Sequence, residues 1–401
     1  MDGAVYITGM GVVCAIGTDC GQVLHSLRSE ASGIGPVRYL RTVHRDMPVG
    51  EVGMSDEELY GALGLELREP VLPRTALLGM LALREALRDA SLEAGMLGGC
   101  AFISGTTVGG MDRSEQYYRN YLADDSRDGY IAFHDCRSCT ELTAAYAGRF
   151  GTVTTVSTAC SSAANAIIMG ARMIESGETD IVVAGGSECL SKFHFNGFRS
   201  LMILDRMPCR PFDACRAGLN LGEGAGYVVL ESRSSALRRG ARPLAVLSGY
   251  GNSCDAYHQT ATSPSGEGPY LAMSRALGKA GLSPDAVDYV NAHGTATENN
   301  DATEAAAIRR LFGDRLPYVS STKAFTGHTT SASAGVEAVI SILALRHGFV
   351  PANLRWSAPM EDGIVPVTST LYRPLSHVLC NSFGFGGNDS ALLLSKYAED
   401  E

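Results

Sequence analysis

The sequence predicts an α/β protein in which a sheet is covered by helices on both faces. Two observations support this prediction: short apolar runs alternate with amphipathic helical segments, and glycines cluster where the runs end. Such alternation favours a sheet between helical layers. The units form two sets, so we expect one half over residues 1–240 and another over residues 241–401. At about 150 residues per domain, the length fits two to three domains or one duplicated fold.

Seven apolar or β-branched runs predict buried strands, because most of them stop at glycine or at a polar turn. They cover residues 4–13, 100–110, 180–188, 226–231, 243–251, 287–294 and 390–397. Glycine accounts for 46 of the 401 residues and lies beside these runs rather than in flexible linkers. We therefore expect tight turns at the strand ends and two halves that pack as one body.

Five segments carry apolar residues at spacings of three and four, which is typical of helices with one buried face. They cover residues 73–90, 161–177, 268–281, 300–313 and 333–348. Because they lie between the predicted strands, they supply the helical layers.

The composition excludes several classes of protein. Apolar residues make up 45% of the chain and charged residues 19%, which is typical of a globular protein rather than a disordered one. The net charge of −10 argues against nucleic acid as a partner. The most apolar run, residues 336–348, is too short to span a membrane. The start of the chain has an acid at position 2 and no basic segment, so we expect a first strand rather than a secretory signal, and a cytoplasmic protein.

Eleven cysteines are scattered singly along the chain, which suits reduced thiols better than a disulfide framework. One pair, Cys136 and Cys139, has metal-ligand spacing and lies beside His134. It lacks a matching second pair, so we interpret it as structural and expect no metal.

The strongest candidate for chemistry is Cys160. A β-branched run ends at Thr158, and Cys160 opens a helix whose first turn contains only small residues. Unpaired backbone N–H groups and the positive end of the helix dipole stabilise a thiolate at such a position. The alternative is an ordinary buried cysteine at a strand–helix junction, which this segment alone does not exclude.

Two histidines and a lysine lie in comparable places. His293 follows an apolar strand, at the carboxyl end where open α/β sheets bind ligands, although a capping role is equally compatible. Lys323 precedes His328 by five residues and lies among small and apolar residues rather than charges. A partly buried lysine beside an imidazole would hold the ring neutral, so that its N–H can donate to a developing anion.

The segment of residues 379–394 alternates glycines with Phe383 and Phe385. Phosphate-binding loops need a helix after the glycines, whereas a strand follows here, so we reject nucleotide binding. A mobile loop that gates a pocket and offers a backbone N–H fits the segment better.

Four motifs, in this order and spacing, resemble the β-ketoacyl-acyl carrier protein synthases, specifically the KAS II-like condensing enzymes. They are TACSS with Cys160, NAHGTAT with His293, KAFTGH with Lys323 and His328, and NSFGFGG with Phe383 and Phe385. The resemblance extends over essentially the whole chain.

The resemblance implies the thiolase fold, with two similar α/β halves stacked as five layers, α-β-α-β-α. It also implies a decarboxylative Claisen condensation: Cys160 takes an acyl group from acyl carrier protein, and malonyl-acyl carrier protein then extends it by two carbons to a 3-oxoacyl product. His293 and His328 would stabilise the enolate, and the backbone N–H groups of Cys160 and Phe385 would hold the oxyanion. Lys323 and Glu337 would orient and tune the second histidine.

Further positions take roles from the same resemblance. The gate would comprise Phe383, Gly384, Phe385 and Gly386. Thr295 and Thr297 would bind the pantetheine arm, and Val108 and Phe195 would line the acyl pocket. Asp255 and His258 belong to a supporting motif that we expect to bind substrate.

The resemblance implies acyl carrier protein as partner, substrates carried on its phosphopantetheine, no bound cofactor, and a homodimer or a heterodimer with a chain-length factor. A coenzyme A-dependent thiolase, with Cys380 as second thiol, is an alternative that the two-histidine set disfavours. A chain-length factor itself would lack the nucleophile, and nothing in the sequence requires a cysteine hydrolase.

The chain departs from the common family pattern at residues 327–337, at Leu219–Asn220 and at Asn388–Asp389. The added hydroxyls after His328 suggest a specialised synthase, such as one that elongates polyenes, rather than the housekeeping enzyme.

Overall fold

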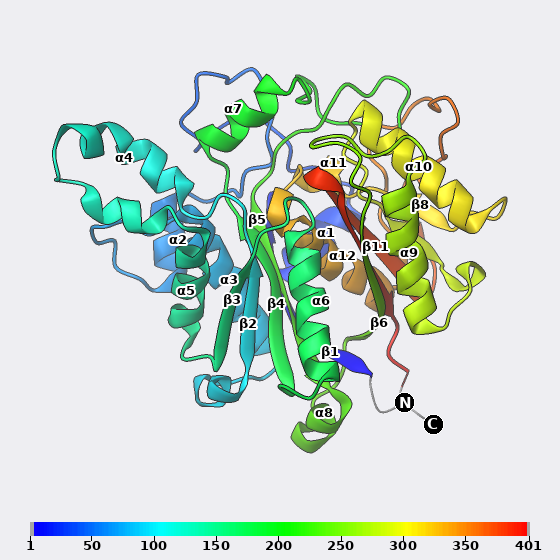
Figure 1. The fold of residues 1–401 in the computed structure, drawn as a ribbon, viewed down its shortest axis with the longest axis horizontal. Coiled ribbons are helices and arrows are strands. Elements are labelled where there is room, and N and C mark those ends of the chain that lie inside the picture. The colour runs from blue at the N-terminus through cyan, green and yellow to red at the C-terminus, as the bar shows by residue number, and fades with distance from the viewer. Residues whose placement is uncertain (1–3, 399–401) are drawn as a thin grey trace.

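The computed structural model describes residues 4–398 and contains a ten-stranded sheet with helices on its faces (Figure 1). The first five strands are β1 (Val5–Cys14), β2 (Ala101–Gly105), β3 (Thr152–Val156), β4 (Ile181–Glu188) and β5 (Gly224–Ser232). The other five are β6 (Ala245–Cys254), β7 (Tyr289–Asn291), β8 (Tyr318–Ser320), β11 (His377–Gly384) and β12 (Asn388–Ser395). Two short strands, β9 (Phe349–Val350) and β10 (Leu371–Tyr372), pair separately.

The two sets of strands have the same topology. Their orders are β3-β2-β4-β5-β1 and β8-β7-β11-β12-β6, and in both sets the first three strands are parallel and the last two antiparallel. The sets meet where β1 pairs with β6 in antiparallel register, with Val5 opposite Leu247. The chain thus repeats one topology without a visible repeat in sequence. The division at residue 240 stays a prediction, and the repeated strand order supports it.

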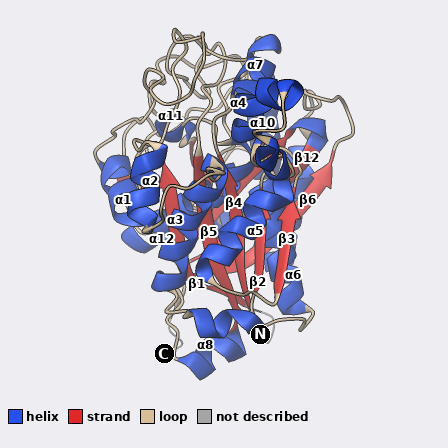
Figure 2. Ribbon diagram, turned by 90° about the vertical axis from the view of Figure 1, so that its left-hand side faces the viewer, coloured by secondary structure: helices blue, strands red, loops and turns tan. Residues whose placement is uncertain are grey.

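Helices lie outside and between the two halves of the sheet (Figures 1 and 2). The helices that form these layers are α3 (Arg74–Asp89), α5 (Cys136–Ala147), α6 (Ser162–Glu175), α9 (Glu267–Ala280), α10 (Glu298–Phe312) and α12 (Ser333–His347). Helices α3 and α5 pack on the outer face of the first half, and α9 and α10 on that of the second. Helices α6 and α12 share a core with the inner faces of both. The result is the five-layered thiolase-like fold, as predicted.

Six further helices lie outside these layers in the described part of the chain. They are α1 (Cys20–Arg28), α2 (Asp56–Leu63), α4 (Met111–Ala123), α7 (Lys192–Ser200), α8 (Arg233–Arg239) and α11 (Lys323–Thr326). Within residues 4–398, five 3-10 turns span Ala94–Gly99, Asp128–Phe133, Pro284–Ala286, Thr330–Ala332 and Phe385–Gly387. Neither these helices nor α5 are among the five predicted from the sequence, because they are short or lack a continuous apolar face at helical spacing.

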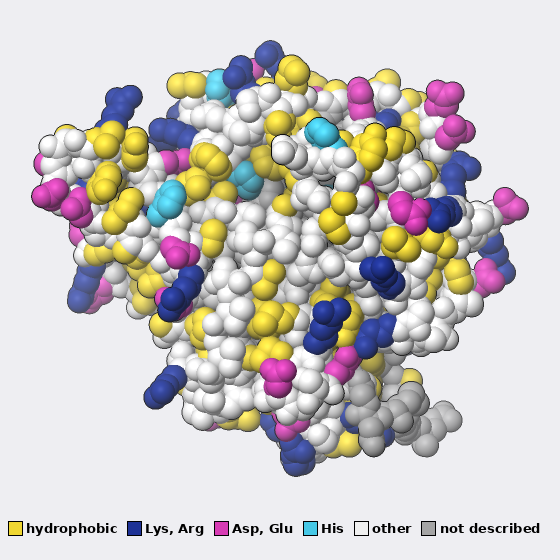
Figure 3. Space-filling view, viewed as in Figure 1, with side chains coloured by type: hydrophobic (Ala, Val, Ile, Leu, Met, Phe, Trp, Pro, Cys, Tyr) yellow, Lys and Arg dark blue, Asp and Glu magenta, His cyan; other side chains and the backbone are white. Residues whose placement is uncertain are grey.

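The central helix α12 explains the most apolar run of the sequence. Residues Ser333–Leu345 are buried on every side, so the helix has no polar face. No helix within residues 4–398 has both the length and the apolar character needed to cross a membrane. On the face drawn in Figure 3, acidic and basic side chains are interspersed.

The first strand of each half contains a Gly-x-Gly pair that lets a helix approach closely. A Cβ on Gly11 would lie 2.1 Å from the carbonyl oxygen of Ala82 in α3, and a Cβ on Gly251 would lie 2.1 Å from that of Ala272 in α9. Only glycine fits such contacts. The same device therefore sets the sheet–helix distance in both halves.

The glycine-rich segment differs from the predicted mobile loop. Phe383 and Gly384 are the last residues of β11, and they pair with Asp389 and Asn388 of β12. Only Phe385–Gly387 forms the turn, in which Gly386 and Gly387 have positive φ. The segment is a hairpin because its backbone groups are satisfied by strand pairing almost to its tip.

Candidate active site

The sulfur of Cys160 lies where the chain passes from β3 to α6. Ala159 directly before it has a φ of 53°, a left-handed conformation uncommon outside glycine. The hydroxyl of Ser162 supports this turn: it donates to the carbonyl oxygen of Ala159 at 2.6 Å and accepts the backbone N–H of Thr158 at 2.8 Å. The turn places Cys160 at the amino-terminal end of α6, as predicted.

Both predicted histidines lie beside this sulfur. Nε2 of His328 is 3.2 Å from Sγ of Cys160, and the ring of His293 meets that of His328 edge-on at a centroid distance of 5.3 Å. One ligand atom from each of the three residues lies within 4.8 Å of the others. Nδ1 of His293 is buried without a hydrogen-bond partner in the described part of the chain. A thiol and two imidazoles could also hold zinc, but the contact between Nε2 and the thiol fits proton transfer equally well.

Both imidazoles are held neutral. Burial lowers the pKa of His293 and of His328 well below the usual value, and the positive charge of Lys323 lowers both further. The neighbouring His328 also lowers the pKa of His293. A neutral imidazole carries one N–H donor and one acceptor nitrogen, so each ring can donate a hydrogen bond to an anion.

The thiol of Cys160 differs from the expected thiolate. Burial raises its pKa to about 11, although Lys323 and the backbone N–H groups of Phe385 and Cys160 act in the opposite direction. The helix terminus is therefore not sufficient to ionise the resting thiol. Cys160 needs a proton acceptor, and Nε2 of His328 is within hydrogen-bond distance.

Lys323 and Glu337 form an ion pair behind the histidines. Nζ of Lys323 lies 2.5 Å from Oε1 of Glu337, and both side chains are at least 97% buried. Burial raises the pKa of Glu337 to about 7, against the lowering effect of Lys323. The pair brings α11 and α12 together and fixes the cation that, after burial, lowers the pKa of both imidazoles.

Glu304, which no sequence motif indicated, positions His293. Glu304 of α10 accepts the backbone N–H groups of His293 at 2.8 Å and of Gly294 at 2.7 Å, and the side-chain amide of Asn381 at 3.0 Å. An acid on the polar-to-apolar boundary of a predicted helix gave no distinctive signal, because its partners are backbone groups.

A cavity of about 350 Å³ leads to Cys160. The predicted residues that line it are Cys160, His293, Thr295, Thr297, His328, Phe383, Gly384 and Phe385. Phe198 of α7, which was not among the predicted residues, also lines it and stacks on Phe385 at a centroid distance of 5.7 Å. Both rings therefore form part of the wall of the cavity that contains Cys160.

The remaining predicted substrate residues do not line this cavity. Val108 donates its backbone N–H to Glu188, and Phe195 is buried in α7 against His44. Asp255 accepts the backbone N–H of Ser263, and His258 that of Thr260; Gly386 lies in the hairpin turn. Their roles in substrate binding stay predictions.

The predicted cysteine pair lies at the start of α5, away from this cavity. Cys139 is buried, and the thiol of Cys136 donates to the carbonyl oxygen of Thr107 at 3.4 Å. Nδ1 of His134 bonds instead to the hydroxyl of Ser114 at 2.9 Å. These partners agree with a structural interpretation.

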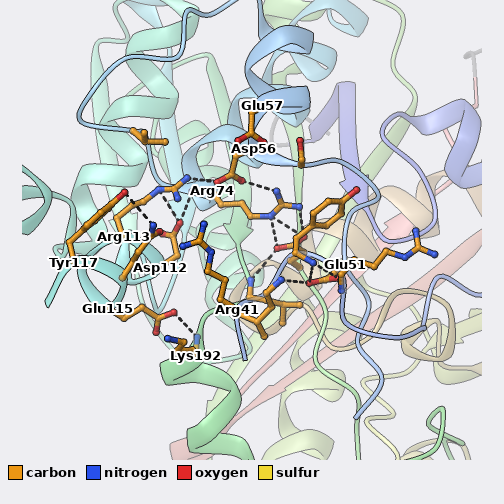
Figure 4. Close-up of a pocket in the computed structure, with 18 of the residues that line it drawn as sticks. Arg41, Glu51, Asp56, Glu57, Arg74, Asp112, Arg113, Glu115, Tyr117 and Lys192 are labelled. Carbon is orange, nitrogen blue, oxygen red and sulfur yellow. Dashed lines mark hydrogen bonds and ion pairs between the residues drawn. The ribbon is translucent and has the colours of Figure 1, made fainter. Parts of the chain in front are cut away.

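A second cavity, of about 540 Å³, lies between α2, α4 and α7 (Figure 4). Four of its charged side chains form an ion-pair network: Arg74 pairs with Glu223 at 2.7 Å and with Asp56 at 2.9 Å, and Arg113 pairs with Asp56 at 2.6 Å. We interpret this network as a connection between α2, α3, α4 and the residue before β5.

Asp389 of β12 is an unusual buried carboxyl group beside the site. Neither of its oxygens has a hydrogen-bond partner in the described part of the chain, and burial, Asp255 and Glu304 raise its pKa to about 8. The unfolded chain has an aspartate pKa of about 3.9. Between these values the folded state holds a proton that the unfolded state lacks, so stability falls as pH rises.

We expect Asp389→Asn to remove this dependence. The melting temperature of the variant should match the wild type near pH 4 and exceed it increasingly up to pH 8, because the amide needs no proton to be neutral. Calorimetry at several pH values tests this, with Asp314→Asn as an exposed control. If the melting temperatures of the wild type and Asp389→Asn changed with pH in parallel, the carboxyl group would be ionised in the folded protein.

The fold and the Cys-His-His site define a condensing enzyme of the thiolase-like fold. Family models of the β-ketoacyl synthase match in two parts, the N-terminal domain over residues 2–236 and the C-terminal domain over residues 244–357. The chain belongs to the β-ketoacyl synthase family, which confirms the resemblance and the enzyme class predicted from the motifs.

Similar proteins cover nearly the whole chain. Nodulation protein E of Rhizobium meliloti (strain 1021) is 36% identical over 98% of this chain and 99% of its own length. The 3-oxoacyl-[acyl-carrier-protein] synthase 2 of Synechocystis is 33% identical over 98% of both chains.

Two solved structures are similar as well. The ishigamide ketosynthase/chain length factor has a TM-score of 0.92 at 31% identity, covering 99% of this chain and 100% of that one. The ketosynthase ApeO in complex with its chain length factor ApeC, from Xenorhabdus doucetiae, has a TM-score of 0.84 at 30% identity, covering 98% of both.

Proposed function

We propose that this synthase condenses an acyl group held on Cys160 with malonyl-acyl carrier protein and releases a 3-oxoacyl-acyl carrier protein two carbons longer. The observation that carries the proposal is the 3.2 Å contact between Cys160 and the neutral His328, with His293 beside them. We expect the acyl groups to arrive on phosphopantetheine and no cofactor to be needed. The scattered reduced cysteines favour the cytoplasm as its location.

The first half-reaction is acyl transfer. The thiol of Cys160 passes its proton to Nε2 of His328, and the thiolate attacks the acyl thioester carbonyl. The backbone N–H groups of Cys160 and Phe385, which already face the sulfur, hold the resulting oxyanion. Collapse breaks the bond to the pantetheine sulfur, which takes the proton back from His328 and leaves as a thiol.

The second half-reaction is decarboxylative condensation. His293 and His328 donate N–H groups to the malonyl thioester oxygen, so that loss of carbon dioxide leaves its electron pair in a stabilised enolate. The enolate carbon attacks the acyl carbonyl on Cys160, and collapse expels the thiolate, which takes up one proton from solvent. Two neutral imidazoles suit this step, because two cations so close together would repel each other.

The hydroxyl of Ser333 allows His328 to adopt the tautomer that each half-reaction needs. Its Oγ lies 3.2 Å from Nδ1 of His328, and a hydroxyl can donate or accept. His328 can therefore present Nε2 as an acceptor to the thiol and later as a donor to the malonyl oxygen.

Intact-protein mass spectrometry with a panel of acyl-carrier proteins tests the proposal. We expect an acyl adduct on the wild type and none on Cys160→Ala, and we expect the adduct to disappear when malonyl-carrier protein is added, as a product two carbons longer forms. An adduct that persists after malonyl-carrier protein is added would contradict the proposal.

The panel also tests the pathway. Thr329, Thr330 and Ser331 are buried directly after His328, and the hydroxyl of Thr330 has no partner in the described part of the chain. These hydroxyls support the proposal of a specialised synthase for polyunsaturated chains. A clear preference for saturated chains would contradict it.

A second arrangement is that this chain is the active subunit of a heterodimer. Two similar structures, at 30 and 31% identity, contain a ketosynthase with a chain length factor. Cys160, His293 and His328 are all present here, so this chain would be the catalytic partner. Full acylation and condensation by the chain alone would argue against this arrangement.

A further inference from the structure

Asn388 is the first residue of β12, directly after the turn that contains Phe385. Its Oδ1 accepts the hydroxyl of Ser161 at 2.8 Å and the side-chain amide of Asn165 at 2.7 Å. The amide of Asn252, on β6, donates to the same oxygen at 3.0 Å. Donors from the helix cap, from α6 and from β6 thus converge on a single side-chain oxygen.

These donors also hold the turn around the nucleophile. Ser161, which is fully buried, follows Cys160, and its hydroxyl shares its single proton between Oδ1 of Asn388 and the carbonyl oxygen of Thr158, each 2.8 Å away. Asn165 donates to the hydroxyl of Thr158 at 2.8 Å. The residues on both sides of Cys160 are therefore linked to Asn388.

The end of β11 passes directly over this cluster. A Cβ on Gly384 would lie 3.0 Å from the carbonyl oxygen of Thr158 and 3.2 Å from the hydroxyl of Ser161. On the other side, Ser382 donates its hydroxyl to the carbonyl oxygen of Cys160 at 2.9 Å. The β11–β12 hairpin thus contacts the residues around Cys160 from both of its strands, through Ser382 in β11 and through Asn388 in β12.

We propose that Asn388 is a positioning residue that keeps the backbone N–H of Phe385 aligned with Cys160 for oxyanion binding. The proposal rests on the proposed function, since it assigns that N–H to the acyl-transfer oxyanion. The turn at Phe385–Gly387 includes two glycines with positive φ, and hydrogen bonds on both sides restrict it. Oxyanion donors act only at about 3 Å from the developing charge, so a small displacement is costly.

Two substitutions of Asn388, by alanine and by aspartate, test whether its acceptor oxygen is needed. Alanine at 388 removes the acceptor and leaves three donors without their shared partner, whereas aspartate keeps an acceptor oxygen in the same place. Two rates are compared: acyl transfer from acyl-carrier protein to Cys160 in a single turnover, and alkylation of Cys160 by iodoacetamide. Alkylation forms no oxyanion, so it reports on the thiol alone.

We expect Asn388→Ala to slow acyl transfer by about 10- to 100-fold, while alkylation stays within about twofold. Asn388→Asp should restore most of the acyl-transfer rate. In the double variant with Ser161→Ala, the loss should be smaller than the product of the two single losses, because both remove the same link. Ser248→Ala, which breaks a hydrogen bond to Ser395 at the far end of the β6–β12 pair, is the matched control.

Three outcomes would decide against the proposal. Unchanged acyl transfer in Asn388→Ala would show that the hairpin holds its position without this residue. An equal loss of alkylation and acyl transfer would show that Asn388 supports the thiol or the fold and not the oxyanion donor. An equal effect of Ser248→Ala would show a general loss of strand packing. A wild type that is alkylated normally but never acylated would instead refute the proposed function.

Discussion

Replacement of His293 by alanine is expected to stop condensation while Cys160 still takes up an acyl group. The ring of His293 lines the cavity, and its Nδ1 has no partner in the described part of the chain. It does not contact the thiol as His328 does, so acyl transfer does not depend on it. Removing one donor to an enolate oxygen costs about 10²–10³-fold in rate.

The expected result is a mass adduct on His293→Ala that persists after malonyl-carrier protein is added. Single-turnover mass spectrometry measures both half-reactions in one experiment. The backbone at this position is held by Glu304, so the loss of the ring does not release the turn. His377→Ala, on the distant end of β11, is the matched control for a lost histidine. If His293→Ala abolished acylation as well, the division of labour between the two histidines would be wrong.

The sequence predicts a site residue correctly where the neighbouring residues in the same segment determine its position in the fold. Cys160 follows a β-branched run and precedes small residues, and the strand–helix junction formed there as expected. His293, Lys323 and His328 were found because each lies in a short motif with distinctive neighbours. Such motifs reveal which residues are present, but not the distances between them.

The features that the sequence did not reveal depend on contacts between distant segments. Phe198 and not Phe195 faces the cavity, a choice set by the rotation of α7 against the hairpin. Glu304 and Asn388 act on groups that are remote in the chain. The raised pKa of Cys160 has the same origin, since the burial that causes it comes from the whole fold.

The repeated topology of the two halves is not visible in the sequence for a related reason. Each half needs the same strand order and the same close approach of a helix, which two glycines provide in β1 and in β6. Packing of this kind constrains size and polarity at a few positions and leaves the others free. Two halves can therefore share a fold without visible sequence similarity.

Replacement of Lys323 by methionine is expected to lower stability, most strongly at alkaline pH, and to lower activity, most strongly at acidic pH. The change leaves the carboxylate of Glu337 buried without its cation, and breaking such a pair costs about 3–5 kcal/mol in unfolding free energy. The pKa of Glu337, now about 7, rises further without Lys323. The folded variant then holds a proton that the unfolded chain loses above about pH 4.3, so its stability falls as pH rises.

The activity changes in the opposite sense with pH. Lys323 lowers the pKa of both histidines, so its loss raises them toward the usual value. Protonated rings cannot serve as proton acceptors for the thiol, and the acid limb of the condensation rate therefore moves to higher pH. We expect the rate of Lys323→Met relative to wild type to be lower at pH 6 than at pH 8, as steady-state assays across this range would show.

A double variant separates the two effects. Lys323→Met with Glu337→Gln removes both charges, so it should recover most of the lost stability and keep the displaced acid limb, because the histidines still lack the cation. Lys279→Met, which removes a partly exposed lysine paired with Glu175 at 3.0 Å, is the control and should change neither property much. If the double variant recovered the wild-type pH profile together with stability, the buried cation would serve the fold alone, and the neutrality of the two imidazoles would have to come from burial.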